Sequence, residues 1–146
     1  MLTKKTMLIT IIVILTVGIF AFFILRERYG PEKITIKTEQ GEVKITDITE
    51  NPVEKLSMGG VTFQSTEDFL IEYYPGDQGF IIALLNKDTE KAQIAAEQEF
   101  LRALKINKED ACKLKVSITV PYTVNEKFGG GIYKLSFCEG GQLLKN

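Results

Sequence analysis

The chain lacks histidine and tryptophan altogether in its 146 residues. Without histidine there is no Ser-His or Cys-His nucleophile, and the commonest zinc ligand is missing. Without tryptophan, one good stacking platform for sugars is absent. Carboxylate, lysine and tyrosine chemistry stays open, but the sequence has no catalytic, metal-binding or cofactor-binding signature. We therefore expect neither an enzymatic activity nor a cofactor.

The chain also lacks an excess of basic residues in the part that follows residue 29. Four of the 18 basic residues, but only one of the 19 acidic residues, precede Gly30. The remainder therefore carries about four more acidic than basic side chains. A mildly acidic domain without a basic patch is poorly suited to phosphate backbones, so we expect no nucleic-acid partner.

One long hydrophobic run is present, at residues 7–25, and it contains about 19 residues without a charge. As a helix it would be roughly 28 Å long, close to the hydrocarbon thickness of a bilayer. A cleaved signal peptide is the main alternative. The run is longer than the usual apolar region of a signal peptide, about 7–15 residues, and it ends without a small-residue cleavage site. The sequence predicts an uncleaved anchor, with the membrane as its partner.

This anchor divides the chain into four parts. We predict a cytoplasmic tail at residues 1–6, a transmembrane helix at 7–25, a charged linker at 26–33 and one domain at 34–146. Basic residues flank both ends of the anchor, so the positive-inside rule does not decide its orientation.

Two cysteines, Cys112 and Cys138, flank a predicted hairpin. Apolar and polar residues alternate over 114–120 and again over 133–137, which indicates two half-buried strands joined by the segment 121–131. Folding this stretch about its centre places both cysteines at the open end of the hairpin, within a residue or two of facing each other. The arrangement predicts a disulfide; the alternative is a pair of unrelated buried thiols.

A disulfide would indicate an oxidising compartment, because cytosolic thiols are kept reduced. Together with Lys4 and Lys5 before the anchor, it favours a cytoplasmic N-terminus and an extracytoplasmic domain. The predicted location is the cell membrane, with a single pass.

The other segments predict an α+β domain. Strand patterns occupy 34–36 and 43–48, with a turn at Gln40-Gly41, then 61–64, 69–74 and 80–85; the last is continuously apolar, as in a central strand covered on both faces. Residues 50–60 have the composition of a loop. A helical pattern follows over 88–105, and a capped turn over 107–110. We expect an antiparallel sheet with the main helix on one face and a C-terminal hairpin.

The C-terminal half of the chain contains four segments that carry a resemblance to other proteins, at residues 95–101, 110–114, 120–122 and 135–138. Over about the last 75 residues, the chain resembles a group of short, uncharacterised bacterial proteins that are anchored by a single membrane span. The resemblance implies an envelope location and a C-terminal module to which both cysteines belong. It implies no activity.

Aromatic residues near turns are the candidate partner contacts. Tyr73 and Tyr74 precede the turn at Pro75-Gly76, and strand alternation directs them to opposite faces, so that one is exposed. Tyr122 and Phe128 belong to the Gly-rich segment, which we interpret as a flexible hairpin tip without the pattern of a phosphate-binding loop. In the alternative, Phe128 folds back onto the domain.

The acidic residues of the predicted helix do not form a catalytic pair. Glu97 and Glu99 are two residues apart and cannot share one helical face. We interpret both as part of a solvated helix surface.

These observations predict a non-enzymatic, membrane-anchored binding or structural protein of the cell envelope, with an envelope protein as its partner. Two alternatives stay open. One is an accessory subunit that a membrane complex recruits through the anchor helix. The other is an envelope enzyme that uses carboxylates or tyrosine.

Overall fold

The computed structural model describes residues 18–19 and 32–145. Gly18 and Ile19, inside the predicted anchor, are helical. The remainder of that anchor, the predicted tail at 1–6 and the predicted linker as far as residue 31 lie outside the described residues. Within the described ranges, no helix is long and apolar enough to cross a membrane.

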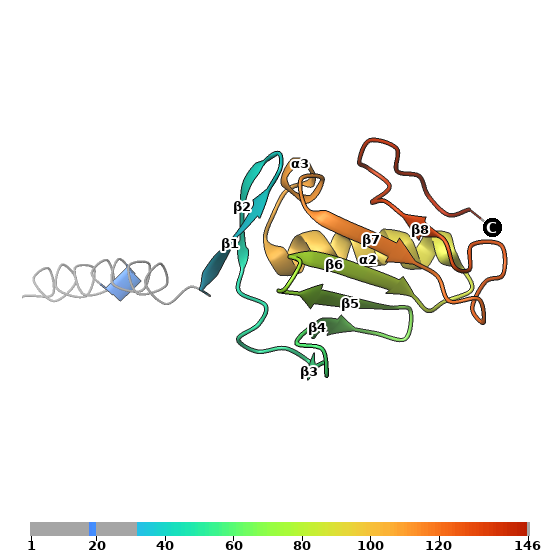
Figure 1. Ribbon diagram of the computed structural model, residues 1–146, viewed down its shortest axis with the longest axis horizontal. Coiled ribbons are helices and arrows are strands. Elements are labelled where there is room, and N and C mark those ends of the chain that lie inside the picture. The colour runs from blue at the N-terminus through green and yellow to red at the C-terminus, as the bar shows by residue number, and fades with distance from the viewer. Residues whose placement is uncertain (1–17, 20–31, 146) are drawn as a thin grey trace, which may run out of the picture. The chain divides into compact units, whose positions relative to one another are not determined.

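From Lys33 onward the chain forms one unit around a six-stranded sheet (Figure 1). Its strands, in spatial order, are β3 (Glu54–Lys55), β4 (Val61–Ser65), β5 (Phe69–Tyr74), β6 (Gly79–Leu84), β7 (Lys115–Thr119) and β8 (Ile132–Tyr133). The pair β5–β6 is a regular hairpin in which Tyr74 pairs with Gly79 and Phe69 with Leu84. The predicted α+β domain of antiparallel strands with one main helix is confirmed.

Helix α2 (Thr89–Leu104) covers one face of this sheet. It begins where the Asp88 side chain accepts a hydrogen bond from the Lys91 amide, at 3.2 Å. It ends at Lys105, which has the left-handed conformation with φ 55°. The short helix α3 (Lys108–Ala111) follows, capped by Asn107 as predicted.

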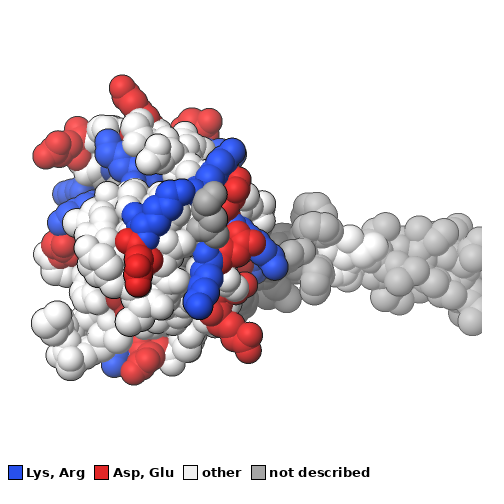
Figure 2. Space-filling view, turned by 90° about the vertical axis from the view of Figure 1, so that its right-hand side faces the viewer, with Lys and Arg blue, Asp and Glu red and all other residues white. Residues whose placement is uncertain are grey.

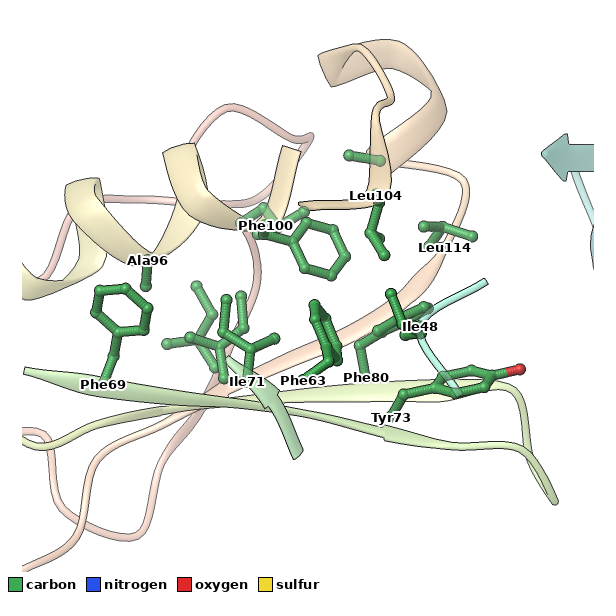
Figure 3. Packing of buried hydrophobic residues seen from close by; sticks show 14 of the residues in the cluster. Ile48, Phe63, Phe69, Ile71, Tyr73, Phe80, Ala96, Phe100, Leu104 and Leu114 are labelled. Carbon is green, nitrogen blue, oxygen red and sulfur yellow. The ribbon is translucent and has the colours of Figure 1, made fainter. Parts of the chain in front are cut away.

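The core lies between α2 and the sheet (Figure 3). Small residues on the helix, Ala92 and Ala96, allow close approach to the strands. Beside them Phe100 meets Phe80 edge-to-face, with ring centroids 5.2 Å apart. Because β5 and β6 send every second residue to this side, one face of each strand is buried and the other is not. The predicted cover on both faces of β6 is therefore wrong.

Strands β6 and β7 run parallel, which is a second departure from the prediction of an antiparallel sheet. The reason is the connection between them. Helix α2 carries the chain back along the sheet, so the next strand starts at the same end as the previous one.

The predicted N-terminal hairpin is confirmed and consists of β1 (Lys33–Thr38) and β2 (Gly41–Thr46), but it forms a two-stranded sheet of its own and not part of the main sheet. Gly41 has φ 124° in the turn, a conformation that favours glycine. Val43 and Ile45 are buried, and the Thr46 hydroxyl lies 3.5 Å from the Leu104 carbonyl oxygen at the end of α2. The hairpin therefore closes one end of the core.

The C-terminal hairpin is shorter than predicted. Strand β7 pairs with β8 only through Ile118 with Tyr133 and Thr119 with Ile132. The predicted strand over 133–137 thus ends at Tyr133, and the predicted loop over 50–60 contains the short strand β3. The predicted disulfide between Cys112 and Cys138 is confirmed, with Cα atoms 5.5 Å apart. In the chain-entropy model, closing a loop of this length contributes about 3–4 kcal/mol.

Candidate functional site

The side of the sheet opposite α2 carries no helix in the described part of the chain, and it faces the viewer in Figure 1. We call this side the open sheet face. Strand alternation and register place these residues on it: Leu70, Glu72 and Tyr74 of β5, Ile81 and Ala83 of β6, and Lys115, Ser117 and Thr119 of β7. All are partly or fully exposed. Apolar side chains thus remain accessible in the centre of a sheet.

A hollow of about 350 Å³ lies at one end of the open sheet face. We call it the Tyr74 hollow; its lining includes Met58, Tyr74, Asp77, Ile81, Lys115 and Ser117. Met58 lies in the turn between β3 and β4 and is 85% exposed. The hollow lies within the volume range of ligand-binding pockets, about 300–1,000 Å³, and offers an apolar wall with a charged rim.

The Tyr74 ring is held in place from two sides. A Cβ atom on Gly60 would lie 2.8 Å from two ring carbons, so the ring rests on backbone that only glycine can provide. The Tyr74 hydroxyl donates a hydrogen bond of 2.9 Å to Glu72 Oε2. That hydrogen bond, with smaller effects of burial and neighbouring carboxylates, raises the pKa of the Tyr74 phenol. The ring is therefore oriented before any partner arrives.

An ion pair forms the rim of this hollow. Lys115 Nζ lies 2.8 Å from Asp77 Oδ2, and the Gly79 amide donates to Asp77 Oδ1 at 3.2 Å. Together these contacts, that of Lys115 first, hold the pKa of the Asp77 carboxyl below its usual value. The pair joins the β5–β6 turn to the start of β7.

The Gly-rich segment is packed rather than a bare flexible tip. Tyr122 lies over it: a Cβ atom on Gly129 or Gly130 would come within 2.6 Å of the Tyr122 ring. Phe128 folds back, as in the predicted alternative, and meets Tyr133 edge-to-face with centroids 6.1 Å apart. Tyr122 is still 66% exposed, with one face of its ring on glycine backbone.

The four predicted contact residues do not form one site. Tyr73 is only 4% exposed and packs on Phe80 in the core. Tyr74 lies at the end of the sheet marked by Gly79 and Lys115, whereas Tyr122 and Phe128 follow the opposite end of β7. Of the four, only Tyr74 lines the Tyr74 hollow.

Helix α2 carries a row of buried polar residues that was not predicted from the sequence. Thr89, Gln93 and Glu97 are spaced four residues apart, which places them on one side of the helix. The Thr89 hydroxyl donates to the Leu144 carbonyl at 2.6 Å, and Gln93 Oε1 accepts from the Leu144 amide at 2.9 Å. This row binds the C-terminal segment to the helix.

Glu97 completes the row and corrects the prediction of a solvated helix surface, since it is only 5% exposed. Its carboxyl group accepts hydrogen bonds from the amide and the hydroxyl of Ser136, both at 2.5 Å, and from Gln93 Nε2 at 3.0 Å. The spacing of Thr89, Gln93 and Glu97 is the sequence signal that could have identified a polar contact along the helix.

Charges are interspersed on the face drawn in Figure 2, where basic and acidic side chains alternate without a large patch of one sign. Among residues 18–19 and 32–145, no group of three or more histidine, cysteine, aspartate or glutamate side chains is placed to hold a metal ion. The open sheet face is the candidate surface that brings a predicted contact residue, Tyr74, together with accessible apolar side chains.

A comparison of the chain with protein-family models, curated proteins and solved structures finds no match.

Proposed function

We propose that this chain is a non-enzymatic, membrane-anchored binding protein of the cell envelope, whose open sheet face contacts a protein partner. The observation that carries the proposal is the Tyr74 hollow. It combines an oriented, accessible tyrosine with an exposed methionine and a strand isoleucine.

This composition suits a protein partner. Tyrosine and methionine are enriched in the cores of protein interfaces, where an anchor side chain enters a largely preformed pocket. Met58 is unbranched and adapts its shape to a partner, whereas Tyr74 is held by Gly60 and Glu72. The Asp77–Lys115 pair forms a polar rim beside the apolar wall.

Two features support the envelope location. The uncharged run at residues 7–25 has the length of a membrane span. The Cys112–Cys138 disulfide is a bond that persists in oxidising compartments and is rare in the cytosol. Both fit a domain that is presented outside the cytoplasm by an N-terminal anchor.

Site-specific photo-crosslinking of the full chain, in the cells that make it, tests the proposal. A photo-reactive residue in place of Ile81, inside the Tyr74 hollow, should give one discrete crosslinked protein. The same residue in place of Gln98, on the exposed side of α2, should not.

The variants Tyr74→Ala and Met58→Ala, combined with the Ile81 probe, should each reduce this crosslink at least threefold. An undiminished crosslink would mean that the Tyr74 hollow does not contact the partner. A crosslink that is lost when residues 7–25 are exchanged for an unrelated apolar helix, but survives Tyr74→Ala, would favour the accessory-subunit alternative.

A further inference from the structure

Strand β8 leaves the sheet after two residues, and the contacts of Glu97 explain why. A longer antiparallel ladder would place Lys134 to Ser136 along β7. Instead, the amide and hydroxyl of Ser136 both bind the Glu97 carboxyl group on α2. Figure 1 shows the C-terminal segment curving away from β7 after β8.

The first half of β7 is therefore left with an open edge. No strand in the described part of the chain pairs with the outer side of Lys115, Val116 or Ser117. The Val120 carbonyl accepts a hydrogen bond from the Gly130 amide on this same side. Because alternate residues of a strand present their backbone groups to the same edge, the amide and carbonyl of Val116 also point outward there.

A hollow of about 410 Å³ lies against this edge. We call it the β7 notch; its lining includes Leu114, Val116, Leu135 and the Cys112–Cys138 disulfide. A neighbouring hollow of about 390 Å³, beside the turn of the β1–β2 hairpin, shares Gln40, Cys112, Leu114 and Lys115 with it. Together the two hollows continue the open edge beyond the length of β7.

We propose that the β7 notch binds an extended segment of the protein partner, which adds to the sheet as a strand beside Lys115–Ser117. Backbone hydrogen bonds to Val116 would provide affinity, and alternate side chains would provide specificity. The side chain opposite Val116 enters the apolar part of the notch. Its two neighbours lie on the open sheet face beside Lys115 and Ser117, at the border of the Tyr74 hollow.

Charge indicates the composition of this segment. The charged side chains that line the β7 notch are Lys115, Lys134 and Glu139, a net charge of +1. Because Lys115 is already paired with Asp77, Lys134 is the cation of this lining that attracts the segment. The partner segment is therefore extended, with an apolar central residue and an acidic residue near it. This inference rests on the proposed function, since it takes the same partner to span the notch and the Tyr74 hollow.

A displayed library of linear random decapeptides, selected against the full chain in detergent micelles, provides the probe. Selected peptides should be rich in an apolar residue with an acidic residue near it. The variant Lys134→Glu should weaken their binding by about threefold to tenfold. The matched variant Lys44→Glu makes the same charge change on exposed strand β2, outside both hollows, and should leave the affinity unchanged.

Hydrogen exchange of the complex tests the added strand directly. The amide of Val116 should exchange at least tenfold more slowly with a selected peptide bound, because it becomes a donor to the peptide backbone. Absence of that protection would overturn the proposal, as would an equal effect of both charge variants or a selection that yields no binder.

The two proposals fail in different ways. Peptides that lose affinity in Tyr74→Ala but leave the Val116 amide unprotected would contradict strand addition while supporting the open sheet face. Protection of Val116 together with no crosslink from Ile81 would contradict the proposed contact at the Tyr74 hollow.

Discussion

At the residue scale, the Tyr74 phenol responds to one neighbour above all. Its hydrogen bond to Glu72 favours the protonated form and raises its pKa. The stability contributed by this group is present below the pKa of about 10 that tyrosine has in the unfolded chain, and it is lost as pH rises through the higher folded value.

We predict that Glu72→Gln lowers the pKa of Tyr74 toward its ordinary value. An alkaline titration of tyrosine absorbance measures this, and Tyr74→Phe identifies the transition that belongs to this residue. Glu109→Gln, on the exposed surface of α3, serves as the control. Burial also raises the pKa of Tyr73, so a late transition of that residue is expected in every variant. A Tyr74 transition that stays late in Glu72→Gln would show that burial, and not this hydrogen bond, dominates.

Glu97 was predicted to lie on the solvated surface of the helix, but the structure buries it. We predict that Glu97→Ala lowers the free energy of unfolding by about 2 kcal/mol, because it removes the acceptor of the Ser136 amide and one of the two acceptors of Gln93 Nε2 in the interior. Urea denaturation of the full chain measures the loss.

The neighbouring variant Glu99→Ala removes only an i,i+3 pair with Arg102, whose side chain is largely exposed. Such a change should cost less than about 1 kcal/mol. Equal losses in the two variants would mean that Glu97 does not bind the C-terminal segment in solution.

At the scale of elements, the loop between β7 and β8 is organised by glycine. Gly130 has φ 71°, and an added Cβ atom would meet the Tyr122 ring at 2.6 Å. We predict that Gly130→Ala destabilises the domain by about 1–2 kcal/mol, through backbone strain and displacement of the ring. The shift of the thermal unfolding midpoint reports it.

Gly76 provides the matched control for that substitution. It lies in the turn between β5 and β6, and a Cβ atom there has open space around it. Gly76→Ala should change the midpoint little. If the Gly130→Ala chain were as stable as this control, Tyr122 would not be packed on the glycine backbone. The loop would then be a flexible hairpin tip, as predicted from the sequence.

At the scale of the whole molecule, the disulfide and the anchor make a joint prediction about topology. In intact cells, a membrane-impermeant thiol reagent should label Cys112 and Cys138 only after reduction, because the proposed topology places the domain outside and the two thiols form a disulfide. Mass spectrometry of the labelled chain measures this. Labelling that requires lysis and no reductant would place the domain in the cytoplasm and contradict the proposed function.

Local patterns predicted most of the elements well. Alternation located β5 over Phe69–Tyr74 within its observed bounds, and the change of period located α2 to within a residue at each end. The capped turn at Asn107 was recognisable because capping depends on neighbours a few residues away. Facing cysteines in a hairpin predicted the disulfide by the same local argument.

The candidate site was predicted only in part. Tyr74 was among the proposed contacts, but Met58, Ile81 and Ser117 were not, because three separate strands and a turn bring them together. Alternation correctly separated Tyr73 from Tyr74 without saying which one faced α2. That choice depends on which side of the sheet the helix covers, and this is a long-range property.

The sequence by itself determined the periodicities, the caps, the two cysteines and the uncharged run at residues 7–25, since each of these is read within a short window. Only the tertiary structure decided that β6 and β7 run parallel, that Glu97 is buried and that β8 stops after Tyr133. The physical reason is that each depends on groups far apart in the chain. Ser136 binds Glu97 across 39 residues, and that contact turns the strand away from β7 and leaves its edge open.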